Sequence, residues 1–183
     1  MILTDREIRI SLENKAITID PPPSIDAYSS TSLDLTLAGS LRVFKPTHGG
    51  VRIVVDPAAP DYRFGAAMNA LADTAPIPDD GFTLQPGLLV LGWTAENVSL
   101  FPQSRIAARV EGKSSLARLG LAVHVTAPTI HAGFKGQIQL EIINHGPVPI
   151  CLRTGMKICQ LIFETTLGVP EAGYRGQFAG QHA

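Results

Sequence analysis

The sequence predicts a mainly β protein, built as a β-sandwich or barrel, with one short helix at its N-terminus. The first observation is a series of short strand-like runs, at residues 33–37, 52–55, 88–93, 105–110, 121–125, 137–142 and 157–163. The second is the presence of turn residues between them, at 85–87, 145–147 and 153–155. Short strands with regular turns are typical of sandwiches and barrels. The 183 residues suit one domain, 1–183, with enough chain to bury a hydrophobic core.

The segments outside these strands have their own signals. Thr4-Asp5-Arg6-Glu7 fits a capping box, so we expect a helix that continues through about Leu12. Residues 56–81 are rich in Ala, Asp and Pro, which predicts a long loop with at most a brief helix near 66–72. The tail, about 168–183, is Gly-rich and polar, and we expect it to be flexible.

Composition excludes several classes of protein. Hydrophobic residues make up 45% of the chain, charged residues 17%, and the net charge is −1, so no broad basic surface indicates nucleic-acid binding. No apolar run approaches the ~20 residues of a membrane span. The chain is charged from its start, unlike a signal peptide. Cys151 and Cys159 lie in apolar strand-like sequence, which predicts buried free thiols and a cytoplasmic protein.

One segment combines charge, hydroxyls and turn residues: Gly112, Lys113, Ser114, Ser115, Arg118 and Gly120. Ser114 or Ser115 is expected to cap one short helical turn that ends at the second glycine. Lys113 and Arg118 would add charge-assisted contacts to an anion, so the segment is a candidate phosphate-binding turn. A P-loop is excluded because the residue five positions before the first glycine is Ala107. The alternative is an ordinary capped turn with solvated charges.

A single carboxylate on a predicted strand is the candidate general base. Residues 137–142 alternate strictly, so their apolar side chains share one face, and Glu141 shares the other with two glutamines. Glu141 becomes a candidate base if the fold brings it near the 113–118 turn. The alternative is a solvated carboxylate on the surface of the sheet.

Several blocks together resemble one family, the dCTP deaminase branch of the trimeric dUTPase-like superfamily. The blocks are residues 3–8, 32–35, 84–87, 113–121, 123–127, 133–136, 140–144, 155–164 and 174–177. This similarity covers most of the chain. It implies a distorted, jelly-roll-like β-barrel assembled as a homotrimer with its active sites between subunits.

The resemblance also implies the reaction, which is hydrolytic deamination of dCTP to dUTP and ammonia. Magnesium is then expected on the triphosphate, and zinc is not. The sequence agrees on zinc, because no histidine begins a His-x-Glu motif and the two cysteines lie eight positions apart.

By the family pattern, Glu141 is the general base and proton shuttle, and the carbonyl of Ala127 positions the water together with Ser114 and Arg118. The substrate-binding positions implied by the resemblance are Lys113, Ser115, His124, His131, Gln160, Tyr174 and Gln177. Of these, His124 would support the site, although a core histidine is the alternative reading. The tail residues would close over the nucleotide.

Several positions depart from the family pattern, including Pro128 and Thr129, which replace residues that are often polar or basic in the family. Lys113 stands where the family usually has Arg, and a lysine keeps the charge but lacks the bidentate fork. His131 stands where the family has an Asp that holds the deoxyribose 3′-hydroxyl, and dUTPases use the matching Asp to orient water. Gly173 replaces an expected Lys. Two further hypotheses remain beside a deaminase: a dUTP pyrophosphatase, acting alone or after deamination, and a nucleotide-binding regulator without turnover.

Overall fold

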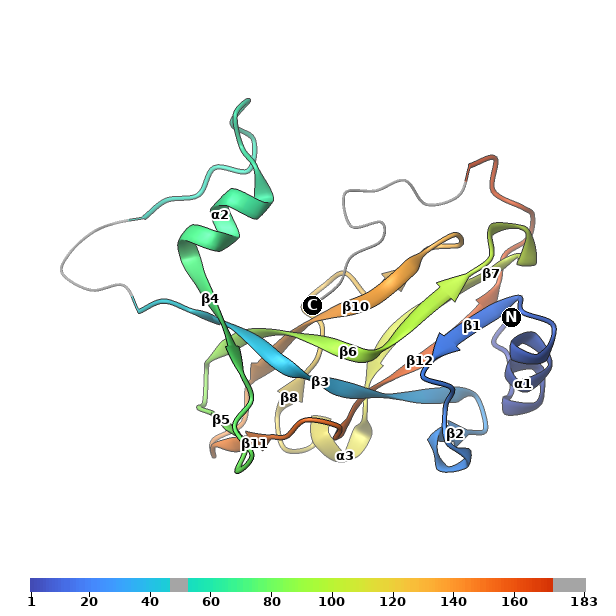
Figure 1. The fold of residues 1–183 in the computed structure, drawn as a ribbon, viewed down its shortest axis with the longest axis horizontal. Helices are drawn as coiled ribbons and strands as arrows, with labels where there is room; N and C mark the ends of the chain where they lie inside the picture. The colour runs from blue at the N-terminus through green and yellow to red at the C-terminus, as the bar shows by residue number, and fades with distance from the viewer. Residues whose placement is uncertain (47–52, 173–183) are drawn as a thin grey trace.

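The computed structural model describes residues 1–46 and 53–172, and the fold is mainly β, as predicted (Figure 1). The helices are α1 (Asp5–Glu13), α2 (Phe64–Leu71) and α3 (Ser114–Ala117), with 3₁₀ turns η1 (Ile25–Ala27) and η2 (Pro102–Ser104). The strands are β1 (Ile17–Asp20), β2 (Tyr28–Ser29), β3 (Ser32–Phe44), β4 (Ala72–Pro76), β5 (Phe82–Leu84), β6 (Leu89–Leu100), β7 (Ile106–Gly112), β8 (Leu121–Ala122), β9 (Thr129–Ile130), β10 (Lys135–Asn144), β11 (Ile150–Leu152) and β12 (Lys157–Thr165).

The main sheet is antiparallel and curls on itself. Its strands follow the order β8-β10-β6-β3-β12-β7-β9, with β1 added to β6 and with β2 and β4 added to β3, while β5 and β11 pair separately. The two ends of this path, β8 and β9, are joined by only the six residues 123–128. Six residues span at most about 20 Å, so the opposite edges must approach each other. This closure gives the expected distorted barrel and creates a seam between β10 and the β7–β9 edge.

Strand β3 turns the sheet by changing partners along its length. Its first half pairs with β12, and its second half pairs with β6 and β4. The ladders are interrupted by register shifts between Leu37 and Leu41 and between Lys157 and Cys159. Such bulges increase local twist and bend a sheet, which is what a rolled sheet requires. One hydrophobic cluster fills the interior, with Leu33, Leu35 and Phe163 among its fully buried members.

The N-terminal helix forms as its capping box predicts. The Thr4 and Glu7 side chains and backbone groups make both capping contacts, and α1 extends one residue past the expected end. Its apolar face buries Ile8 completely against the barrel. The adjoining strand β1 then pairs with β6, so the opening segment is fixed at both ends.

Two expected strands are wrong in part. Residues 53–55 form no strand, and their side chains are exposed, because no sheet edge of the described residues lies beside this β-branched run. Arg52, the first residue of the expected strand, lies outside the described residues. The strand predicted at 121–125 ends after Ala122, because the chain leaves the sheet there to cross the seam.

The 56–81 loop contains more structure than expected. Helix α2 confirms the brief helix, and β4 follows it directly to pair with β3. Met68 packs with Leu91 in a small second cluster, which also receives Phe44 and Phe64. In Figure 1, α2 stands at one end of the rolled sheet, beyond β4.

The cysteines differ from each other. Cys159 is buried, as predicted, but Cys151 is exposed, because it points outward from the short β11 strand. Among residues 1–46 and 53–172, no helix is long and apolar enough to cross a membrane.

Candidate active site

A cavity of about 310 Å³ opens at the seam of the barrel. It is lined by Phe64, Val110, Val123, His124, Ala127, Thr129, Ile130, His131, Phe134, Ile138, Gln139 and Glu141. Besides Glu141, three of the predicted site residues line this cavity: His124, Ala127 and His131. The loop 123–128, which closes the sheet, supplies two of these residues, and the end of β9 leads into the third.

Glu141 occupies the wall of this cavity because of the alternation of β10. Leu140 and Ile142 point into the core and are buried, while Glu141 faces outward and is half-buried. Its Oε2 accepts a long hydrogen bond of 3.4 Å from the backbone N–H of Val125, in the seam loop. A carboxylate held beside apolar side chains, with free acceptor capacity, is suited to accept a proton from water.

His124 lies next to this wall with one ring nitrogen unpaired. Its Nε2 is 4.0 Å from Oε2 of Glu111. Its Nδ1 is buried and has no hydrogen-bond partner among the described residues. Glu111 in turn pairs with Arg109 at 3.1 Å, and Arg109 pairs with Glu164 at 3.1 Å. The imidazole therefore lies beside one end of a row of paired charges, Glu111, Arg109 and Glu164, along β7 and β12.

The candidate phosphate turn, residues 113–120, lies outside the Glu141 cavity. Ser114, Ser115 and Arg118 are exposed, and none of them lines that cavity. A second hollow is lined by α3, the following turn and His124, so this histidine lies between the two regions. Within one copy of the chain, the turn therefore borders a different hollow from the one that contains Glu141, and its charged and hydroxyl side chains line neither of the two.

The expected serine cap is absent. Lys113 is the N-cap residue, with extended backbone angles of −80° and 129° and no capping hydrogen bond from its side chain. The reason is that β7 leads directly into α3, so the change from strand to helix occurs at Lys113. Its carbonyl accepts the N–H groups of Leu116 and Ala117, and the turn continues through residue 119.

Gly120 ends this turn in a conformation that requires glycine. Its φ is +94°, and a Cβ at this position would lie 2.2 Å from the backbone nitrogen of Gly146. The carbonyl of Gly120 also accepts the N–H of His145 at 2.8 Å. The end of the turn therefore packs tightly against the loop that follows β10, and β10 is the strand that carries Glu141.

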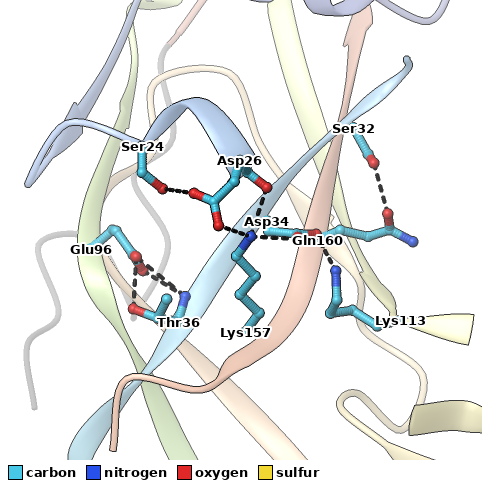
Figure 2. A network of polar contacts seen from close by, with 9 residues as sticks. All are labelled: Ser24, Asp26, Ser32, Asp34, Thr36, Glu96, Lys113, Lys157 and Gln160. Carbon is cyan, nitrogen blue, oxygen red and sulfur yellow. Dashed lines mark hydrogen bonds and ion pairs between the residues drawn. The ribbon is translucent and has the colours of Figure 1, made fainter. Parts of the chain in front are cut away.

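Lys113 itself is drawn inward by a buried acid. Its Nζ lies 2.5 Å from Oδ1 of Asp34, and the two side chains are 22% and 8% exposed (Figure 2). Gln160 also has partners within the chain. It accepts from the hydroxyl of Ser32 at 2.7 Å and donates to the carbonyl of Gly112 at 3.0 Å. The segment that leads into α3 is thus held from two sides.

Some residues that line or support the site were missed by sequence reasoning. Asp34 lies between two leucines of a predicted strand, and the only signal in the sequence was its place on the strand face opposite those leucines. Phe64 belongs to the 56–81 region, which gave no indication that it reaches the cavity. Tyr174 and Gln177 lie outside the described residues. Within the described ranges, no three His, Cys, Asp or Glu side chains form a metal-binding group.

Comparison with known proteins identifies the family. The sequence pattern of a dCTP deaminase-like family matches residues 2–166. A dCTP deaminase from Rhodospirillum rubrum is 40% identical over 98% of this chain and 94% of its own length. The chain belongs to the dCTP deaminase family. Another family member, a dCTP deaminase from a Shewanella species, is 44% identical over 92% of this chain and 86% of its own.

Solved structures confirm the dUTPase-like fold. The crystal structure of a 2′-deoxycytidine 5′-triphosphate deaminase from Agrobacterium tumefaciens superposes with a TM-score of 0.67 and 25% identity. That match covers 90% of this chain but 48% of the Agrobacterium chain, which is about twice as long. A Staphylococcus bacteriophage 80alpha dUTPase has a TM-score of 0.52 at 11% identity, which shows a shared fold.

Proposed function

We propose that this protein hydrolyses the exocyclic amine of dCTP, giving dUTP and ammonia. The carrying observation is Glu141, the carboxylate on the wall of the seam cavity, in a chain of the dCTP deaminase family. The partly apolar lining, with Phe134, Ile138 and Val123, suits a flat pyrimidine ring. We place the reaction in the cytoplasm.

In the proposed mechanism, Glu141 takes a proton from water as the oxygen attacks C4 of cytosine. Glu141 passes this proton to the ring nitrogen N3, which gives the tetrahedral intermediate with a hydroxyl on C4. Glu141 then takes the proton of this hydroxyl and carries it to the amine, the C4–N4 bond breaks as the C4 carbonyl forms, and ammonia leaves. The carbonyl of Ala127 and the side chains of Ser114 and Arg118 hold the water by hydrogen bonds. A fixed carboxylate in this role typically contributes ~10²–10⁴-fold to the rate.

We further propose that the enzyme is a homotrimer with its sites between subunits. The support is the separation of the two halves of the site within one chain. Glu141, Ala127 and His131 surround the cavity, while Ser114 and Arg118 are exposed on a turn outside it. A neighbouring copy would supply its turn to complete the cavity. His124, which borders both hollows, would then lie at the junction.

The triphosphate is proposed to bind to the turn residues Lys113, Ser115 and Arg118. Magnesium would be held by the phosphates themselves, and no side chain of this chain is assigned to it. His131 would border the sugar, and Gln160, Tyr174 and Gln177 complete the proposed substrate-binding set.

The direct test incubates the purified protein with dCTP or dUTP and magnesium, and measures ammonia and pyrophosphate separately. A deaminase releases ammonia from dCTP and no pyrophosphate from dUTP. Pyrophosphate from dUTP would identify a pyrophosphatase, and neither product would identify a regulator without turnover.

The variant Glu141→Gln isolates the base. It keeps the shape of the side chain and removes its ability to take a proton, so kcat should fall by about 10²–10⁴-fold with dCTP binding retained. Glu13→Gln, the same change at an exposed position on α1, is the matched control. Near wild-type ammonia release by Glu141→Gln would remove Glu141 from the mechanism.

A further inference from the structure

Asp34 is a buried carboxylate for which the proposed reaction has no use. It lies in β3, is 8% exposed, and has a lysine on each side. A buried ionised group normally requires a charged partner and hydrogen bonds, because its removal from water is costly. The contacts of Asp34 show which lysine is its main ion-pair partner.

The strand register places Asp34 directly behind the candidate phosphate turn. Gln160 of β12 is paired with Asp34 on one side and with Glu111 of β7 on the other. These three polar side chains therefore form a row across three strands, on the face opposite the buried leucines. Strand β7 ends at Gly112, one residue before Lys113, so the row leads to the root of α3.

The two lysines beside Asp34 are bound differently (Figure 2). Lys113 contacts Oδ1 of Asp34 at 2.5 Å, and among the described residues its ammonium makes no hydrogen bond to another acceptor. Lys157 is 3.9 Å from Oδ2, and it also donates to the carbonyl and the carboxylate of Asp26 at 2.6 and 2.8 Å. The hydrogen bond from Lys157 to the carboxylate of Asp26, with a second one from Ser24, lowers the pKa of Asp26 to about 2. Lys157 therefore pairs mainly with Asp26, and Asp34 is the main partner of Lys113.

We propose that Asp34 is a positioning residue that holds the Lys113 ammonium in place for the nucleotide phosphates. This inference rests on the proposed nucleotide binding by the 113–118 turn. An ammonium has three donors, so one bond to Asp34 leaves two for phosphate oxygens. A lysine side chain has a flexible four-carbon stem and loses much rotamer freedom when it is fixed. The bond to a buried carboxylate removes that freedom before the ligand binds.

The same geometry explains how a lysine can serve where the family usually has arginine. A guanidinium binds phosphate with a planar fork that orients itself, whereas an ammonium is a point charge without that fork. The tether to Asp34 gives the point charge a fixed location. Gln160 adds to this by holding the carbonyl of Gly112, immediately before the lysine.

The test measures ligand binding by calorimetry, so it does not depend on turnover. Wild type, Asp34→Asn and Asp26→Asn are compared with dCTP, dCMP and deoxycytidine in the presence of magnesium. Asp26→Asn is the matched control, because it removes a carboxylate from the same network but from the exposed side, away from Lys113. For Asp34→Asn we expect dCTP to bind about tenfold more weakly or worse, while deoxycytidine binds as before. Asp26→Asn should bind all three ligands as wild type does.

A double-mutant cycle with Lys113→Met shows whether Asp34 acts through the lysine. If it does, Lys113→Met and the double variant with Asp34→Asn bind dCTP equally weakly. This pair remains informative if Asp34→Asn alone fails to fold, because the double variant removes both members of the ion pair. A further loss in the double variant would overturn the proposal.

Other results would also overturn it. Tighter dCTP binding by Asp34→Asn would show that the carboxylate competes with phosphate for Lys113. Equal losses for dCTP and deoxycytidine would show a general structural defect.

A wild-type protein that binds dCTP but releases no ammonia would refute the proposed reaction and leave this inference to be decided by the same binding data.

Discussion

Replacing Gly120 by alanine should displace the turn that carries Ser114, Ser115 and Arg118. The new Cβ would lie 2.2 Å from the nitrogen and 2.4 Å from the Cα of Gly146, both backbone atoms. Real Cβ atoms do not approach so closely, and backbone cannot rotate away as a side chain can. The turn and the loop after β10 would therefore have to separate.

The magnitude has two parts, and a second glycine separates them. A non-glycine residue at positive φ costs about 1–2 kcal/mol, and an overpacked contact costs about 1–3 kcal/mol more. Gly155 has a φ of +77°, close to the +94° of Gly120, but nothing lies within 4 Å of its Cβ position. We expect Gly155→Ala to lose about 1–2 kcal/mol and Gly120→Ala about 2–5 kcal/mol of unfolding free energy.

Urea denaturation of both variants measures these losses, and the KM for dCTP measures the effect on the turn. Gly120→Ala should raise KM because the proposed phosphate-binding groups move, whereas Gly155→Ala should leave it unchanged. Equal stability losses and equal KM values for the two variants would show that the contact with Gly146 does not hold the turn.

Three further predictions concern single side chains. Arg118→Ala should lower kcat and raise KM together, because a charge-assisted hydrogen bond is worth roughly 1.5–3 kcal/mol; unchanged steady-state constants would remove Arg118 from the site. His131→Asp should sharpen the preference for dCTP over CTP, since a carboxylate accepts a stronger hydrogen bond from a 3′-hydroxyl than an imidazole does; an unchanged ratio of kcat/KM values would show that the histidine is neutral. Burial, aided by nearby carboxylates, raises the pKa of the Cys159 thiol, so a thiol reagent should label Cys151 alone in the native protein and both cysteines after unfolding; native labelling of a Cys151→Ser variant would contradict this.

The parts of the fold that could be predicted from the sequence are those with a local cause. The alternation of 137–142 placed Glu141 on the outward face of β10, because side-chain direction along a strand is fixed by the backbone. The capping box likewise placed the start of α1. Residues 53–55 show the limit of the same reasoning. Their β-branched side chains favour a strand, but a strand also needs a partner, and none lies beside them among the described residues.

The features that could not be predicted depend on contacts between distant segments. Lys113 and Asp34 are 79 positions apart, and their pairing follows from the order of β3, β12 and β7 in the sheet. The cavity exists because the ends of the sheet meet across residues 123–128. Capping by Ser114 or Ser115 also failed for a non-local reason, since the pairing of β7 with β12 continues to Gly112 and so sets where the helix begins.

The central claim is that Glu141 of one subunit works with Arg118 of another, and a mixing experiment tests it directly. Glu141→Gln and Arg118→Ala, each inactive or nearly so, are unfolded together and refolded as a mixture, with each variant refolded alone as the control. If sites form between subunits, random assembly gives about a quarter of them both wild-type residues, and deamination of dCTP should recover to about that fraction of wild type. If both residues act within one subunit, every site keeps one defect and the mixture stays as inactive as its components, which would contradict the shared site.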